Sequence, residues 1–115
     1  MMTQAGCIFC DIGAGKSPAN IEYQDDKVVA FWDIDPKSPI HVLIAPKDHL
    51  TWRDIDDKHL SLMGWMDVVA KRVAEKKNLS QDGYRLVMNS GRHAGQVVEH
   101  IHLHLLGGQQ LGPMG

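Results

Sequence analysis

Three histidines alternate with aliphatic residues near the C-terminal end of the chain: His100, His102 and His104. Imidazole can donate or accept a hydrogen bond, attack an electrophile and change its charge near neutral pH. On a regular strand His100 and His104 lie roughly 13 Å apart, which is too far for one zinc ion bound at about 2 Å from each nitrogen. The row therefore favours a face that holds and attacks an anionic substrate over a shared metal.

A second set of reactive side chains is near the N-terminal end, where Cys7 and Cys10 have the spacing of half a zinc site. This spacing alone is a weak signal, because it also occurs in redox motifs and by chance. The alternative is two free thiols on a short helix. A zinc site needs two further ligands from elsewhere in the chain.

Size and charge limit the possible classes of protein. With 115 residues, 43% of them hydrophobic and 23% charged, the chain is expected to be one domain over residues 1–115, with a short flexible tail at 109–115. A net charge of −2 gives no broad basic surface for nucleic acid. The longest apolar run, residues 28–32, is too short for a membrane span, and no signal peptide is evident. We expect a cytoplasmic protein without nucleic-acid or membrane partners.

Periodicity predicts the elements that must position these residues. Alternating or β-branched segments predict strands at residues 21–24, 28–32, 41–45, 84–88 and 97–106, and a short helix or turn is expected at 7–12. Residues 54–78 have the period of a helix. Strands followed by one long helix and then more strands predict an α+β fold with an antiparallel sheet.

The long helix has one continuous apolar stripe and a smaller second patch. Its stripe consists of Leu62, Met63, Met66, Val69, Ala70 and Val73. Leu60, Trp65 and Val68 lie partly outside it. A second apolar patch on a helix often packs against another subunit.

The motifs together resemble those of the histidine triad (HIT) family, in its nucleoside phosphoramidate hydrolase branch. Residues 100–106, HIHLHLL, resemble the triad itself, written His-x-His-x-His-x-x. Asn89 and residues 95–98 resemble the phosphate-binding loop, while residues 31–34 and 41–49 resemble a second signature block. The similarity extends over residues 7–113 with the motifs in order.

This resemblance implies a five-stranded antiparallel sheet, a long and a short helix, and a two-fold homodimer. It also implies metal-independent hydrolysis or transfer of a purine nucleoside monophosphate of the AMP or GMP type. His102 would attack the α-phosphorus and become transiently nucleotidylated, held in the correct tautomer by a backbone carbonyl near His100. His104 would donate to the phosphate, and Gln96 would add a side-chain donor.

The resemblance also implies a nucleotide site. Asp33 would accept the ribose hydroxyls, although a carboxylate there commonly only caps the next turn. The phosphate would be held by Asn89, Gly95, Gln96 and Val97, and the purine ring by Ile8, Phe9, Ile12, Phe31 and Ile34, residues that pattern alone would assign to the core. His41 would support the histidine row from behind.

Family members with a similar Cys-Ile-Phe-Cys start complete a zinc site with two histidines. In this chain these are His49 and His100, which gives a structural Cys₂His₂ set with Cys7 and Cys10. Four protein ligands leave no open position, so the implied zinc is structural and the chemistry needs no metal.

Two departures and three alternatives accompany this interpretation. Val97 replaces a serine found near the leaving group in some relatives, and the tail has no tryptophan. The alternatives are a dinucleoside polyphosphate hydrolase, a metal-dependent hydrolase using His100 and His102, and a purine-nucleotide-binding regulatory module with little turnover.

Overall fold

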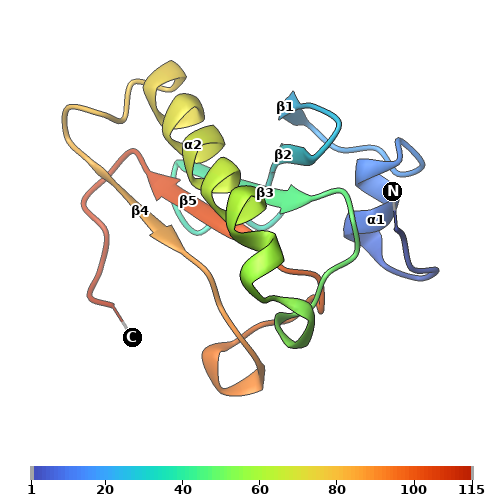
Figure 1. The fold of residues 1–115 in the computed structure, drawn as a ribbon. Coiled ribbons are helices and arrows are strands. Elements are labelled where there is room, and N and C mark those ends of the chain that lie inside the picture. Colours follow the sequence, from blue (N-terminus) through green and yellow to red (C-terminus); the bar gives the residue numbers. More distant parts are fainter. Residues whose placement is uncertain (1, 115) are drawn as a thin grey trace.

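A computed structural model describes residues 2–114 and contains a five-stranded antiparallel sheet (Figure 1). The strands lie side by side in the order β1-β2-β3-β5-β4. In chain order they are β1 (Ile21–Gln24), β2 (Val28–Trp32), β3 (Ile40–Pro46), β4 (Tyr84–Val87) and β5 (Leu103–Gly107). The two α-helices are α1 (Ile8–Gly13) and α2 (Leu60–Lys76). The predicted α+β class and antiparallel sheet are confirmed.

The two faces of the sheet have different partners, as the alternation of side chains requires. Figure 1 shows α2 running across one face. The residues of this layer that pack in one core cluster with α2 are Val28, Ala30, Val42, Ile44, Leu103 and Leu105. On the other face, Val29, Phe31, Leu43 and Ala45 pack with Cys7, Phe9 and Cys10 of the α1 segment. The sheet therefore separates α2 from α1.

Helix α2 is shorter than predicted at both ends. Residues 54–59 belong largely to two 3₁₀ turns, Trp52–Asp54 and Asp57–His59. At the other end Asn78 has a φ of 61°, a left-handed conformation that ends helices. The predicted stripe is correct, because Met66, Val69, Ala70 and Val73 are buried and Leu62 and Met63 pack against them.

The histidine strand is also shorter than predicted, because it covers Leu103–Gly107 instead of residues 97–106. The backbone N–H of Ile101 donates to Leu50 O at 2.8 Å, and that of His100 donates to Val98 O at 2.9 Å. These groups are therefore not used in a ladder with β3. Two of the three histidines precede the strand, yet the row still lies on one side of the sheet, because His100 and His102 both contact Phe9 of α1 and His104 lines the same cleft as His102.

Two other strand boundaries differ slightly from the prediction. Strand β3 includes Ile40 and Pro46, the latter opposite Val28 at the end of the ladder, and β4 ends at Val87, one residue early.

In the tail, Arg85 Nη2 donates to Gly112 O at 2.8 Å, and Gly115, the last residue of the predicted tail, lies outside the described residues. Among the described helices, none is long and apolar enough to cross a membrane.

The second apolar patch of α2 is only partly free. Trp65 donates its ring N–H to Asp25 at 2.7 Å and lies under the guanidinium of Arg72. Leu60 and Val68 remain 72% and 40% exposed. Trp65 therefore belongs to the packing of this chain, and the other two residues form the exposed part of the patch.

Asp25 joins this helix to the β1–β2 turn, and replacing it will destabilise the fold. Its carboxylate accepts from the backbone N–H groups of Lys27 and Val28 and from the side chains of Tyr23 and Trp65, at 2.7–2.8 Å. Although partial burial opposes ionisation, these bonds hold the pKa of Asp25 below its usual value. We expect Asp25→Ala to lower the free energy of unfolding in urea by about 2–3 kcal/mol. The exposed neighbour Asp26→Ala should change it by less than about 0.5 kcal/mol.

Candidate active site and metal centre

A cleft of about 650 Å³ opens on the α1 side of the sheet. It is lined by all of the residues predicted for the nucleotide site, namely Ile8, Phe9, Ile12, Phe31, Asp33, Ile34, Asn89, Gly95, Gln96 and Val97, together with His41, His102 and His104. His100 is not among the lining residues and lies fully buried beneath it. Sequence positions up to about 95 residues apart thus meet in one cleft.

His102 is held in one tautomer. Its Nδ1–H donates to the backbone carbonyl of His100 at 2.7 Å, so its Nε2 carries the lone pair. Burial lowers the pKa of His102, which keeps the ring neutral at pH 7. The ring of Phe9 packs edge-on against it, with 4.9 Å between centroids. This imidazole has the form that a nucleophile requires.

His104 is oriented by a chain of hydrogen bonds that begins in the backbone. The N–H of Lys37 donates to His41 Nδ1 at 3.0 Å, which makes Nε2 of His41 the protonated nitrogen. His41 Nε2 then donates to His104 Nδ1 at 2.9 Å. His104 is consequently left with its proton on Nε2, as a neutral donor beside His102, whose ring centroid is 4.9 Å away.

Asp33 caps the turn that follows it and also lines the cleft. One carboxylate oxygen accepts from the N–H of Asp35 at 2.9 Å and caps the turn. The other lies 3.4 Å from His41 Nε2, and the side chain lines the cleft. The carboxylate therefore has one oxygen committed to the loop and one beside the histidines.

The loop after β4, which was expected to hold the phosphate, uses several of its hydrogen-bond donors within itself. The backbone N–H groups of Gly95 and Gln96 donate to the carbonyls of Arg92 and Gly91. The Gln96 amide closes the same loop, accepting from Gly91 N–H at 2.7 Å and donating to Val98 O at 3.0 Å. Gly91 and Gly95 have φ of 84° and 85°, which glycine adopts without strain. Gln96 thus shapes the loop, and its second amide N–H remains available to a ligand.

The apolar wall of the cleft is partly buried and partly open. Phe9 and Phe31 are only 7% and 3% exposed and pack edge-to-face at 5.3 Å. Ile8 is 47% exposed, Val97 91% and Ile34 fully exposed. The two aromatic residues belong to the core, as pattern alone suggested, and they also form the floor of the cleft.

Behind this wall lies a cluster of four side chains that could hold a metal ion: Cys7, Cys10, His49 and His100. All are buried except His49, which is half-buried. The Nδ1 of His100 lies 3.3 Å and 3.6 Å from the two sulfurs, and the Nδ1 of His49 lies 3.4 Å from that of Cys10. Tetrahedral zinc with its usual bond lengths places sulfur and nitrogen ligands about 3.5 Å apart. The donor set and its spacing therefore fit zinc.

The surroundings of these ligands also suit a metal. His100 Nε2 donates to Pro46 O at 2.7 Å, which leaves the lone pair of Nδ1 facing the sulfurs, and burial lowers the pKa of His100 to about 4. The backbone N–H groups of Gln4 and Cys10 point at the two sulfurs. Burial raises the pKa of the Cys10 thiol, so metal binding there would release a proton.

The same geometry disfavours a metal shared by His100 and His102. Both ring nitrogens of His100 are directed to the cysteines and to Pro46, whereas Nδ1 of His102 bonds the backbone. No pair of nitrogens from these two residues faces a common point in the cleft.

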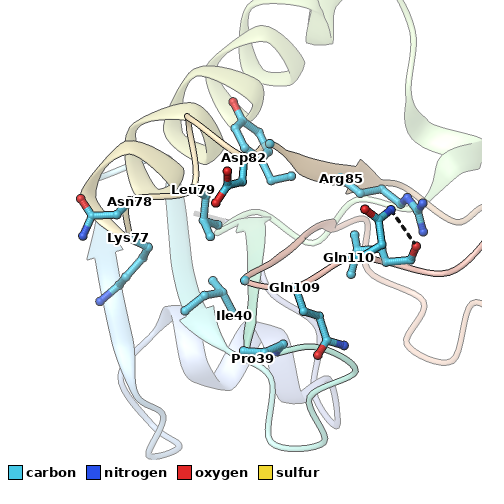
Figure 2. A pocket seen from close by; sticks show the side chains of 13 residues that line it. Pro39, Ile40, Lys77, Asn78, Leu79, Asp82, Arg85, Gln109 and Gln110 are labelled. Carbon is cyan, nitrogen blue, oxygen red and sulfur yellow. Dashed lines mark hydrogen bonds between the residues drawn. The ribbon is translucent and has the colours of Figure 1, made fainter.

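A second hollow, of about 850 Å³, lies where the end of α2 meets the starts of β3 and β4 (Figure 2). None of the seven histidines lines it. Its cations are already paired, because Lys77 contacts Glu22 at 2.9 Å and Arg85 donates to Gly112. It carries no group of reactive side chains comparable to that of the first cleft.

Sequence reasoning missed residues that act through their backbone. The N–H of Lys37 and the carbonyl of Pro46 fix the tautomers of His41 and His100, and the indole of Trp52 donates to the carbonyl of Asn89 at 3.0 Å. Backbone groups are the same in every residue type, so no sequence signal marks these contacts.

The half-buried His104 makes stability depend on pH. Burial, reinforced by His102 and His41, lowers its pKa to about 4 in the folded protein, against about 6.5 when unfolded. The unfolded chain therefore binds more protons between these values, and stability falls as the pH drops from 6.5 to 4. Between pH 7 and 4 the wild type should lose about 3 kcal/mol more than His104→Asn in urea unfolding. Parallel curves for the two proteins would contradict this.

Comparison with known proteins agrees with this geometry. The HIT domain model matches residues 14–111. The chain therefore belongs to the HIT family.

Its relatives include enzymes and zinc-binding proteins. The chain is 49% identical over 108 residues to the purine nucleoside phosphoramidase of Escherichia coli K12, covering 93% of this chain and 91% of that protein. It is 45% identical to a 14 kDa zinc-binding protein of Zea mays, with 90% and 83% covered. The structure of a histidine triad protein from Clostridium difficile matches with a TM-score of 0.94 and 38% identity over 99% of this chain and all of that one.

Proposed function

We propose that this protein hydrolyses purine nucleoside 5′-phosphoramidates through a nucleotidyl-histidine intermediate and releases a nucleoside monophosphate. The observation that carries this proposal is the bond from His102 Nδ1–H to His100 O, which leaves a neutral, unprotonated Nε2 beside the donor His104. The likeness to the purine nucleoside phosphoramidase of Escherichia coli supports the substrate class.

In the first step His102 Nε2 attacks the α-phosphorus and the P–N bond breaks. The departing amine takes a proton, which the Nε2–H of His104 or a water in the cleft can supply. His104 otherwise donates to a phosphate oxygen as charge builds on it. Water then attacks the phosphorus and returns a proton to the group that protonated the amine. The N–P bond to His102 breaks, and the neutral imidazole is restored with the monophosphate released.

The remaining residues would bind the nucleotide. Asp33 would accept ribose hydroxyls with its oxygen beside His41, and the apolar wall around Phe9 and Phe31 would contact the purine. Asn89, Gly95, Gln96 and Val97 would surround the phosphate. Zinc at the Cys₂His₂ cluster would have a structural role, because four protein ligands leave no position for substrate.

The test combines turnover with trapping of the intermediate. Purified protein is mixed with adenosine 5′-phosphoramidate, with and without EDTA, and quenched in alkaline denaturant before mass spectrometry. We expect AMP release and one AMP-sized adduct on the peptide that contains His102, in both conditions. An adduct that disappears with EDTA at a substrate concentration that still saturates the protein would indicate metal-dependent chemistry, whereas AMP binding without release would indicate a regulatory binding module.

We also propose that the protein is a cytoplasmic homodimer. A reducing compartment would keep Cys7 and Cys10 as metal-binding thiols. Leu60 and Val68 on α2 and Leu86 on the edge strand β4 are exposed, and an edge strand offers unpaired backbone groups to a partner. Sedimentation equilibrium should give twice the chain mass, and Val68→Glu should shift the population toward monomer.

A further inference from the structure

We propose that metal at the Cys₂His₂ cluster makes the cleft competent to bind the nucleotide, so that metal occupancy and nucleotide affinity raise each other. The inference rests on the proposed function, because it takes a purine monophosphate as the ligand. Two physical connections between the metal centre and His102 carry it, one through a backbone carbonyl and one through a helix.

The first connection is His100. Its ring is held on both sides, by the two sulfurs near Nδ1 and by Pro46 O at Nε2, and the residue is fully buried. Its backbone carbonyl accepts the Nδ1–H of His102. A metal bond to Nδ1 would therefore fix the direction of the carbonyl that selects the reactive tautomer of His102.

The second connection is α1, which has only six residues and is too short to be stable by itself. Cys7 is its N-cap residue and Cys10 lies within its first turn. The same helix carries Phe9, packed on His102, and Ile8 and Ile12, which line the cleft. Metal bound to both sulfurs would fasten this wall of the cleft to the segments that carry the other two ligands.

These segments come from distant parts of the chain. His49 follows β3, and His100 precedes β5. The core layer between α2 and the sheet lies on the opposite face and contains none of the four ligands. Loss of metal should consequently loosen the cleft and leave that layer folded.

The test uses His49→Ala, because His49 belongs neither to α1 nor to the triad and makes no hydrogen bond to His102. This variant should need more zinc for occupancy. In zinc buffers at 25 °C, we expect its dissociation constant for AMP, measured by calorimetry, to fall about ten-fold or more as zinc binds, until it approaches that of the wild type. Nitrogen NMR of the His102 ring should show the Nδ1–H tautomer become dominant over the same zinc range.

The matched control is His59→Asn. The new side chain can still accept the hydrogen bond that His59 Nδ1 takes from the backbone N–H of Asp56, and His59 belongs neither to the cleft nor to the Cys₂His₂ cluster. Its AMP affinity should follow that of the wild type. Zinc could also bind in the cleft itself, where ligand atoms of Asp33, His41 and His104 lie within 4.8 Å of one another. A change in the AMP affinity of the control at zinc concentrations above those that fill its Cys₂His₂ cluster would report that binding.

Two results would overturn the coupling. One is an AMP dissociation constant of His49→Ala that stays constant while zinc binds. The other is loss of AMP binding together with the far-ultraviolet circular dichroism of the sheet, since the metal would then hold the whole fold. A wild type that binds no AMP at any zinc concentration would instead refute the proposed function as well.

Discussion

His102→Ala should lower the kcat for adenosine 5′-phosphoramidate by about 10⁴-fold or more, because no other group in the cleft offers a neutral imidazole nitrogen fixed as an acceptor. His104 carries its proton on the cleft side, and His41 is occupied on both nitrogens. AMP release followed by chromatography measures the effect. The AMP-sized adduct should be absent from the variant.

Binding of AMP separates this loss from a structural defect. His102→Ala removes the attacking nitrogen and leaves Asp33, the apolar wall and the loop in place, so its AMP dissociation constant should stay within a few-fold of the wild type. His59→Asn should keep full turnover. Turnover by His102→Ala above one part in a hundred of the wild-type rate would show that another group, or an activated water, attacks the phosphorus.

Removal of zinc should have the largest effect on stability. Saturation at a thousand times the dissociation constant stabilises a folded protein by about 4 kcal/mol. For a domain of this size, that corresponds to a fall in Tm of about 15 °C. We expect EDTA to produce this shift in a thermal melt followed by circular dichroism, because the four ligands tie three segments together.

Cys10→Ala provides the comparison for this melt. The substitution removes a buried ligand, so the variant should melt near the Tm of the EDTA-treated wild type, and adding EDTA to it should change little. Equal shifts in both proteins on adding EDTA would mean that the chelator acts elsewhere than at the Cys₂His₂ cluster.

Regular periodicity explains why much of the fold was predictable. Strands β1 and β2 match their predicted residues, and the apolar stripe of α2 is buried as predicted, because both depend on local alternation. The start of the histidine strand was wrong because it depends on a distant partner. The N–H of Ile101 bonds to Leu50, 51 positions away, and no pattern within residues 97–106 encodes that.

The site divides in the same way. The family resemblance, which depends on residue types and their order, predicted one site for His102, His104, Asp33 and the apolar wall, and these residues do line one cleft. The function of each imidazole nitrogen was not predictable, because it depends on which backbone group faces it. The loop shows the same limit. The sequence suggests that Gln96 is a free donor, but its amide oxygen and one amide N–H form hydrogen bonds within the loop.

The open part of the apolar wall has a thermodynamic consequence. Ile34 is fully exposed and Ile8 about half exposed at the rim of the cleft, and a purine that covers them would remove that surface from solvent. Burial of apolar surface gives a negative heat-capacity change. The binding enthalpy of AMP should therefore become more favourable as temperature rises, and Ile34→Ser should flatten that slope in calorimetry between 10 and 35 °C. The rim thus ties recognition of the base to the dehydration of apolar surface.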